Sequence, residues 1–137
     1  MSVAFVLGNG LSRKPIPLEP LKQHGKVYAC NAVYRTFTPD YLVAVDAKMI
    51  NEICTADAHR KMPVWTNPNR AYKKWNGLNF FEPSLGWSSG PTALYLATQK
   101  EHQLIYILGF DFIGSPDGKL NNIYCLLYTS PSPRDEL

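Results

Sequence analysis

Short apolar runs recur along the chain and are separated by polar or turn-forming segments. Each run is four to six residues long and rich in β-branched or aromatic residues. Runs of this length without strict alternation are typical of strands buried on both faces of a parallel sheet. We expect strands at Val3–Leu7, Val27–Cys30, Tyr41–Val45, Met62–Thr66 and Gln103–Leu108.

Two segments between these runs carry helix signals. Ala47–Thr55 places its apolar residues at helical spacing. A second helix is expected to start near Ser89 as N-cap, with Pro91 in its first turn, and to continue through Thr92–Lys100. Strands that alternate with helices predict an α/β fold, a Rossmann-like parallel sheet with flanking helices and right-handed crossovers.

The composition restricts the class of protein. The 137 residues fit one modest domain, and 45% hydrophobic with 18% charged residues indicates a globular chain. No run of about 18 apolar residues or secretory leader is found, so we expect a cytoplasmic protein without a transmembrane segment. Cys30 and Cys54 lack metal-ligand spacing and are expected to be reduced thiols, so no metal site is predicted.

The net charge is +3, from 14 basic and 11 acidic residues, and several of the basic residues lie in one segment. Turn signals mark Asn67–Asn79 as an excursion over the sheet edge. Basic and aromatic residues alternate within it: Arg70, Tyr72, Lys73, Lys74 and Trp75. A solvated face, a nucleic-acid patch and a wall for an anionic sugar nucleotide are all compatible with this pattern.

The first strand runs directly into a Gly-Asn-Gly loop. Such a loop is typical of a backbone that approaches a phosphate or ribose closely. The string GNGLSRK lacks the third glycine of the dinucleotide fingerprint and the Gly-Lys-Ser/Thr of a P-loop. An ordinary dinucleotide enzyme or ATPase is therefore disfavoured, while a plain strand-to-turn connection stays open.

Further polar residues follow the other strands and open the second helix. Open α/β sheets bind ligands outside the carboxyl ends of their strands, and a helix start favours anions. For each strand-end residue alone, strand termination or helix capping is the competing interpretation. The candidate nucleotide-binding residues are Gly8, Asn9, Gly10, Ser12, Asn31, Asp46, Ser88, Ser89, Gly90 and Asp111.

Four islands of sequence resemble a known family. LGNGLS, ACNAVY, SSGPTALYLA and IYILGFDF occur in this order between residues 3 and 112. They resemble the Rossmann-like bacterial sialyltransferases that open with GNGPS, and the related MptE-like hydroxymethylpterin pyrophosphokinases. Leu11 stands where these sialyltransferases usually have proline, and Asp46 where they tend to have asparagine.

The resemblance implies roles for individual residues. Gly8, Asn9 and Gly10 would approach the nucleotide or its sugar, and Asn31 would hydrogen-bond the donor. Residues 88–90 would meet its phosphate or carboxylate, and Asp111 would lie at the ribose or base end of the crevice. A carboxylate at Asp46 would repel an anionic sugar unless a cation such as Lys48 offset it.

Three functions follow as hypotheses. The first is the donor-binding part of a glycosyltransferase-like protein that uses a nucleotide sugar and an unidentified acceptor, with no nucleic-acid partner. The second is pyrophosphoryl transfer from ATP to a pterin alcohol, with Mg²⁺ near Asp46 and Asp111. The third is a non-catalytic nucleotide-binding or scaffold module.

No catalytic residue is assigned, because the family's histidine base and its tyrosines belong to the second half of the fold. The three histidines are expected to be solvated: His24, His59 and His102. The tryptophans are expected to pack in the core or at an interface, with Trp87 the best candidate for a pocket wall: Trp65, Trp75 and Trp87.

The residues at the C-terminal end of the chain resemble a translated laboratory sequence rather than a protein family. Cys125–Asp135, CLLYTSPSPRD, resembles the translation of a transposase adapter used in sequencing libraries. We therefore expect residues 1–124 to be an incomplete donor-binding domain and 125–137 a non-native tail, whose Arg-Asp-Glu-Leu ending is no retention signal. Truncation would leave the strand at Gln103–Leu108 as an exposed, aggregation-prone sheet edge.

Overall fold

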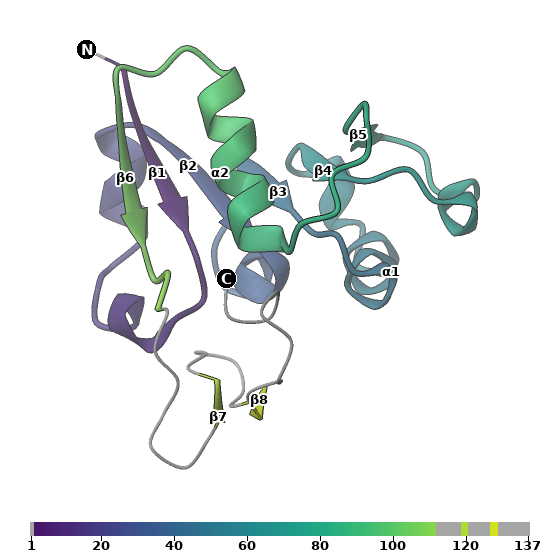
Figure 1. Ribbon diagram of the computed structural model, residues 1–137, viewed down its shortest axis with the longest axis horizontal. Helices are drawn as coiled ribbons and strands as arrows, with labels where there is room; N and C mark the ends of the chain where they lie inside the picture. The colour runs from purple at the N-terminus through teal and green to yellow at the C-terminus, as the bar shows by residue number, and fades with distance from the viewer. Residues whose placement is uncertain (1, 112–118, 121–126, 129–137) are drawn as a thin grey trace.

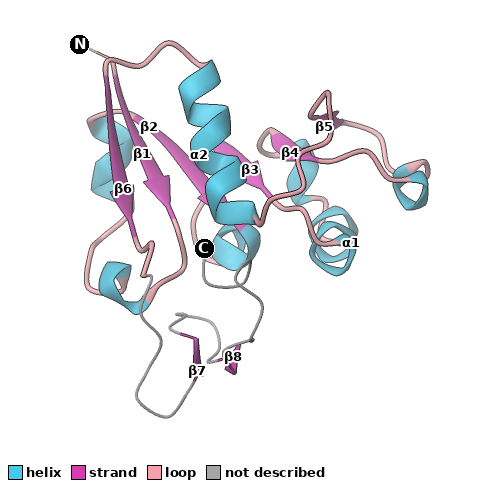
Figure 2. Ribbon diagram, in the orientation of Figure 1, coloured by secondary structure: helices cyan, strands magenta, loops and turns pink. Residues whose placement is uncertain are grey.

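The computed structural model describes residues 2–111, 119–120 and 127–128, and its centre is a six-stranded, all-parallel sheet (Figures 1 and 2). The strands are β1 (Val3–Leu7), β2 (Lys26–Cys30), β3 (Tyr41–Val43), β4 (Val64–Thr66), β5 (Leu78–Phe80) and β6 (Leu104–Leu108), in the order β5-β4-β3-β2-β1-β6. This arrangement confirms the predicted α/β, Rossmann-like fold. A separate antiparallel pair joins β7 (Lys119–Leu120) to β8 (Leu127–Tyr128).

Both faces of the sheet are apolar, and they are buried in the central strands β1, β2 and β3. In β1, Phe5 and Leu7 point into one core, while Ala4 and Val6 point into the other. Successive side chains of a strand point to opposite faces, so a continuous apolar run supplies two cores at once. This is the physical reason why the apolar runs that form the central strands lack polar alternation.

One α-helix packs on each face of the sheet, and 3₁₀ helices share the cover of the core that contains Phe5 and Leu7. α1 (Ala47–Thr55) buries Ile50 and Ile53 in the core that contains Phe5 and Leu7. α2 (Ser89–Gln99) packs across β1, β2 and β3 on the other face, as Figure 1 shows. The sheet is therefore sandwiched between helical layers. Short 3₁₀ helices complete the connections after β1, β2, α1 and β4.

The boundaries differ from the expectation at several elements. β3 and β4 are shorter than predicted, and the N-cap of α2 is Ser88 rather than Ser89. β5 was not predicted, although the Asn67–Asn79 segment does lie at the sheet edge. β5 is three residues long with asparagine at its centre, so it has no apolar run of its own, and its pairing with β4 makes it a strand.

β6 forms the opposite edge of the sheet. It pairs with β1 along its whole length, from Val3↔Leu104 to Leu7↔Leu108. Tyr106 and Ile107 are each 48% exposed. The expected exposed apolar edge is confirmed, and aggregation through it stays a prediction.

Two further expectations concern the chain as a whole. Neither of the two α-helices in the described part of the chain is long and apolar enough to cross a membrane. The expected non-native tail and the truncation near Tyr124 lie outside the described residues, except for Leu127–Tyr128.

Candidate functional site

The carboxyl edge of the sheet gathers every residue predicted for the site. β1, β2, β3 and β6 end there, and α2 begins there. Contacts between distant segments tie the edge together. The Ser12 hydroxyl donates to the Asp111 carboxylate across 99 positions, and the Ser89 hydroxyl donates to Asn31 across 58. The parallel topology, which the sequence only implied, brings these segments into contact.

The junction of β1 and β6 is packed backbone against backbone. The Gly8 N–H donates to the Leu108 carbonyl at 2.7 Å, and the Gly10 N–H to the Gly109 carbonyl at 2.7 Å. A Cβ on Gly8 would lie 2.5 Å from the Gly109 oxygen, and one on Gly10 would lie 2.4 Å from Asp111 Cγ. Close contact with the loop after β6 therefore requires glycine at positions 8 and 10, independently of any ligand.

Asp111 completes this junction from the β6 side. Its carboxylate accepts hydrogen bonds from both the backbone N–H, at 2.9 Å, and the hydroxyl of Ser12. The carboxylate thus holds the turn that follows Gly10 in place. Positioning of this loop is the role that the structure shows for Asp111 and Ser12.

A buried arginine supports the glycine loop from beneath. Arg13 is 4% exposed, and its Nε donates to the Gly8 carbonyl at 2.7 Å while its Nη2 donates to Asn9 Oδ1 at 3.0 Å. Asn9 Nδ2 in turn donates to the Cys30 carbonyl at 3.3 Å, which links the ends of β1 and β2. Arg13 was not predicted as part of the site, because nothing in the sequence pattern distinguishes it from the exposed Lys14 beside it.

A second network joins β2, β3 and α2. The Ser89 hydroxyl donates to Asn31 Oδ1 at 3.0 Å and accepts from the Val45 N–H at 3.1 Å. Asn31 has a left-handed backbone, with φ of 56°, and its amide nitrogen has no hydrogen-bond partner among the described residues. Hydrogen bonds therefore fix the positions of Asn31 and Ser89, and they leave the Asn31 Nδ2 group without a partner among the described residues.

At the start of α2, the first backbone N–H groups have no hydrogen-bond partner among the described residues. The first intrahelical bond runs from the Thr92 N–H to the Ser88 carbonyl, so the N–H groups of Ser89 and Gly90 precede it. Ser88 makes no side-chain cap hydrogen bond. Trp87, 47% exposed, stands edge-on to Tyr95 directly before this turn. Trp65 and Trp75 instead pack against the two cores, as expected.

The two candidate carboxylates lie apart. Asp46 follows β3 and Asp111 follows β6, with β2 and β1 between them. Strands about 4.8 Å apart put these two ends ~14 Å from one another. Asp46 Oδ1 accepts from the Lys48 N–H at 3.0 Å and caps α1. This separation of the strand ends disfavours a single Mg²⁺ ion shared by both carboxylates.

Two of the three histidines are not solvated as predicted. His59 is 7% exposed, contacts Trp75 edge-on, and its Nδ1 has no hydrogen-bond partner among the described residues. His102 bridges the Tyr28 hydroxyl, 2.7 Å from Nε2, and the Ser2 hydroxyl, 2.8 Å from Nδ1. The packing of distant segments around them caused the error, while His24 is exposed as expected.

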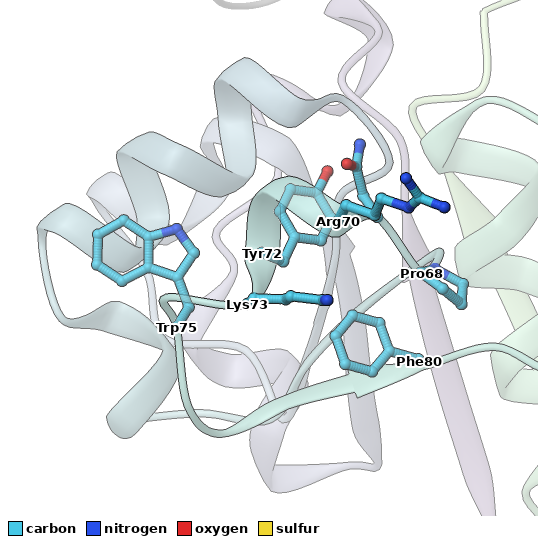
Figure 3. Close-up of a pocket in the computed structure, with 7 residues that line it drawn as sticks. Pro68, Arg70, Tyr72, Lys73, Trp75 and Phe80 are labelled. Atoms are coloured by element: carbon cyan, nitrogen blue, oxygen red, sulfur yellow. The ribbon is translucent and has the colours of Figure 1, made fainter.

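A hollow of about 450 Å³ lies beyond β4, beside the edge strand β5 (Figure 3). The sequence pattern left the chemistry of this segment open. Basic and aromatic side chains from the β4–β5 connection form its wall together with Phe80. The lining residues are Pro68, Asn69, Arg70, Tyr72, Lys73, Trp75 and Phe80.

No protein-family model, curated protein or solved structure matches this chain. The sialyltransferase-like and pyrophosphokinase-like resemblance therefore stays a hypothesis carried by the sequence islands. Among the described residues, no group of three or more His, Cys, Asp or Glu side chains is placed to hold a metal ion.

Proposed function

We propose that this chain binds a nucleotide sugar at the carboxyl edge of its sheet, as the donor-binding part of a glycosyltransferase-like protein. One observation supports the proposal above others: a parallel sheet gathers the glycine loop, Asn31, the start of α2 and Asp111 at a single edge. Ligands of open α/β sheets bind outside the carboxyl ends of the strands.

Different residues at the edge take different parts in this proposal. The N–H groups of Ser89 and Gly90, at the positive end of the α2 dipole, bind the donor's phosphates. The amide nitrogen of Asn31, which has no partner among the described residues, donates to the sugar or to the phosphate. Asn9 and Asp111, whose side chains are already hydrogen-bonded, position the loops that frame the site.

The alternative of pyrophosphoryl transfer makes a different demand. It needs Mg²⁺ held by carboxylates at the phosphates, and Asp46 and Asp111 follow strands that are separated by two others. The geometry thus favours metal-independent binding of a sugar nucleotide. We also propose a cytoplasmic location, supported by the two free, buried cysteines Cys30 and Cys54.

The test is a calorimetric titration of the full chain with CMP-, UDP- and GDP-sugars, with and without Mg²⁺. Asn31→Asp keeps an oxygen for the Ser89 hydroxyl and the shape of the side chain, but it replaces the free amide donor with a negative charge. We expect this variant to weaken binding about tenfold or more, by loss of a hydrogen bond and by repulsion.

Thr98→Ala provides the matched control, because Thr98 is exposed near the other end of α2. It should bind as the unmodified chain does. A folded chain that binds no sugar nucleotide would overturn the proposal, and Mg²⁺-dependent binding of ATP alone would favour pyrophosphoryl transfer. A chain that binds a nucleotide sugar but shows the same affinity in Asn31→Asp would place the ligand elsewhere.

A further inference from the structure

The hollow beside β5 has the size of a small-molecule site. Its volume of about 450 Å³ falls within the range of such sites. Asn69 Oδ1 accepts from the Ala71 N–H at 2.9 Å and caps the 3₁₀ helix Arg70–Tyr72. The Trp75 N–H donates to the Tyr72 carbonyl at 2.9 Å, so hydrogen bonds hold the lining segment on both sides of Tyr72.

Aromatic surface is available inside this hollow. Phe80, the last residue of β5, is 39% exposed, whereas its neighbour Phe81 is 5% exposed and packs in the core. Tyr72 is buried and forms the wall opposite Phe80, and Figure 3 shows Lys73 reaching between the two rings. A flat ring that stacks on Phe80 would remove this apolar face from water.

The hollow is also positively charged. Arg70 and Lys73 line it, no acidic residue does, and neither cation is within ion-pair distance of a carboxylate among the described residues. Burial, followed by smaller contributions that include the charge of Asp46, raises the pKa of the Tyr72 phenol. An anionic group is therefore favoured near Arg70 and Lys73.

We propose that this hollow is a binding site for a nucleotide-like small molecule, in which an aromatic ring stacks on Phe80 and a phosphate is held by Arg70 and Lys73. Arginine offers a planar fork of donors to phosphate oxygens, and lysine adds a mobile point charge. None of the ten residues of the proposed donor site lines the hollow. Binding at the hollow is therefore independent of the function proposed above.

To test this proposal, the ¹⁵N-labelled full chain is titrated with the four ribonucleoside 5′-monophosphates, with the matching nucleosides and with ribose 5-phosphate. We expect at least one monophosphate to shift the amides of residues 68–80, and its nucleoside and ribose 5-phosphate to bind about tenfold more weakly. Phe80→Leu removes the ring but keeps an apolar side chain, and Lys73→Gln removes the charge. Each should weaken binding about fivefold or more.

Two control variants show whether binding belongs to this hollow. Lys26→Gln removes an exposed cation from another strand and should leave the affinity unchanged. Asn31→Asp, which disables the proposed donor site, should leave the shifts at residues 68–80 unchanged. Failure of the donor proposal and failure of this one are therefore distinguishable.

Three results would overturn the inference. The first is the absence of shifts at residues 68–80 with any monophosphate at about 5 mM. The second is equal affinity in Phe80→Leu, in Lys73→Gln and in the unmodified chain. The third is much tighter, strongly salt-dependent binding of a single-stranded oligonucleotide that Phe80→Leu does not weaken, which would identify a nucleic-acid surface instead.

Discussion

The two ends of the carboxyl edge are built in opposite ways. At the β1–β6 end, glycines let one loop lie directly against another, with N–H to carbonyl oxygen distances of 2.7 Å between the heavy atoms. At the β4–β5 end, the connection stands away from the sheet and leaves a hollow of about 450 Å³. The first end contains a familiar glycine motif, and the second contains none.

In this molecule the glycine motif and the open space lie at different places. The Gly-Asn-Gly loop resembles a ligand cradle, yet Gly109 and Asp111 occupy the positions that a Cβ on Gly8 or Gly10 would need. The hollow is lined by basic and aromatic residues that form no recognisable sequence motif and that come together only in the folded chain. We expect substitutions at the first end to act on stability and those at the second to act on binding.

The largest effect is expected from Gly8→Ala. Its Cβ would lie 2.5 Å from a backbone oxygen and 2.8 Å from the Phe110 ring, and a backbone atom cannot move aside cheaply. We expect a loss of about 3 kcal/mol or more in the free energy of unfolding, measured by urea denaturation. Gly86→Ala is the control, because no atom lies within 4 Å of its Cβ position, and it should change stability by less than about 0.5 kcal/mol. Similar midpoints for both variants would contradict the packing described here.

Arg13→Met tests the support beneath the glycine loop. The substitution removes the hydrogen bonds to the Gly8 carbonyl and to Asn9 Oδ1 while it keeps apolar volume. We expect a loss of about 2 kcal/mol in unfolding free energy, again by urea denaturation. The neighbouring Lys14 is exposed, and Lys14→Met should have almost no effect. An Arg13 variant as stable as the Lys14 variant would show that these bonds contribute nothing net.

Alkaline pH should weaken the packed end through Cys30. Burial raises the pKa of this thiol from 9.0 to about 12, an effect that the charge of Arg13 partly opposes. The unfolded chain loses the proton first, so the stabilisation is complete below pH 9 and declines as the pH rises toward 12. The slope for one proton is at most about 1.4 kcal/mol per pH unit. Cys30→Ala should lose less stability between about pH 8 and 11 than the unmodified chain, and parallel curves would contradict the assignment.

The smallest effect on stability is expected at the hollow. Phe80→Leu changes a side chain that is 39% exposed, so the free energy of unfolding should fall by less than about 0.5 kcal/mol. The adjacent Phe81 is 5% exposed and contacts Trp65, and Phe81→Leu should cost about 1–2 kcal/mol. Equal losses for the two variants would mean that Phe80 is part of the core rather than of a binding wall.

Local patterns predicted most of the elements. The bounds of β1 and α1 agree with the prediction at both ends, since continuous apolar runs and helical spacing are properties of adjacent residues. β5 was missed because its pairing partner, not its composition, makes it a strand. His59 and His102 were misjudged for the same reason, as their surroundings come from distant parts of the chain.

The order of residues predicts that strands alternate with helices in this chain and that polar residues follow the strands. Which of those polar residues meet depends on the tertiary fold. The fold places β6 beside β1, so that Gly8 packs against Gly109, and it places β5 beside β4, so that Phe80 and Lys73 line the same hollow. The physical reason is that secondary-structure preferences act between near neighbours, whereas strand order is set by burying two apolar faces at once, which involves residues far apart in the chain.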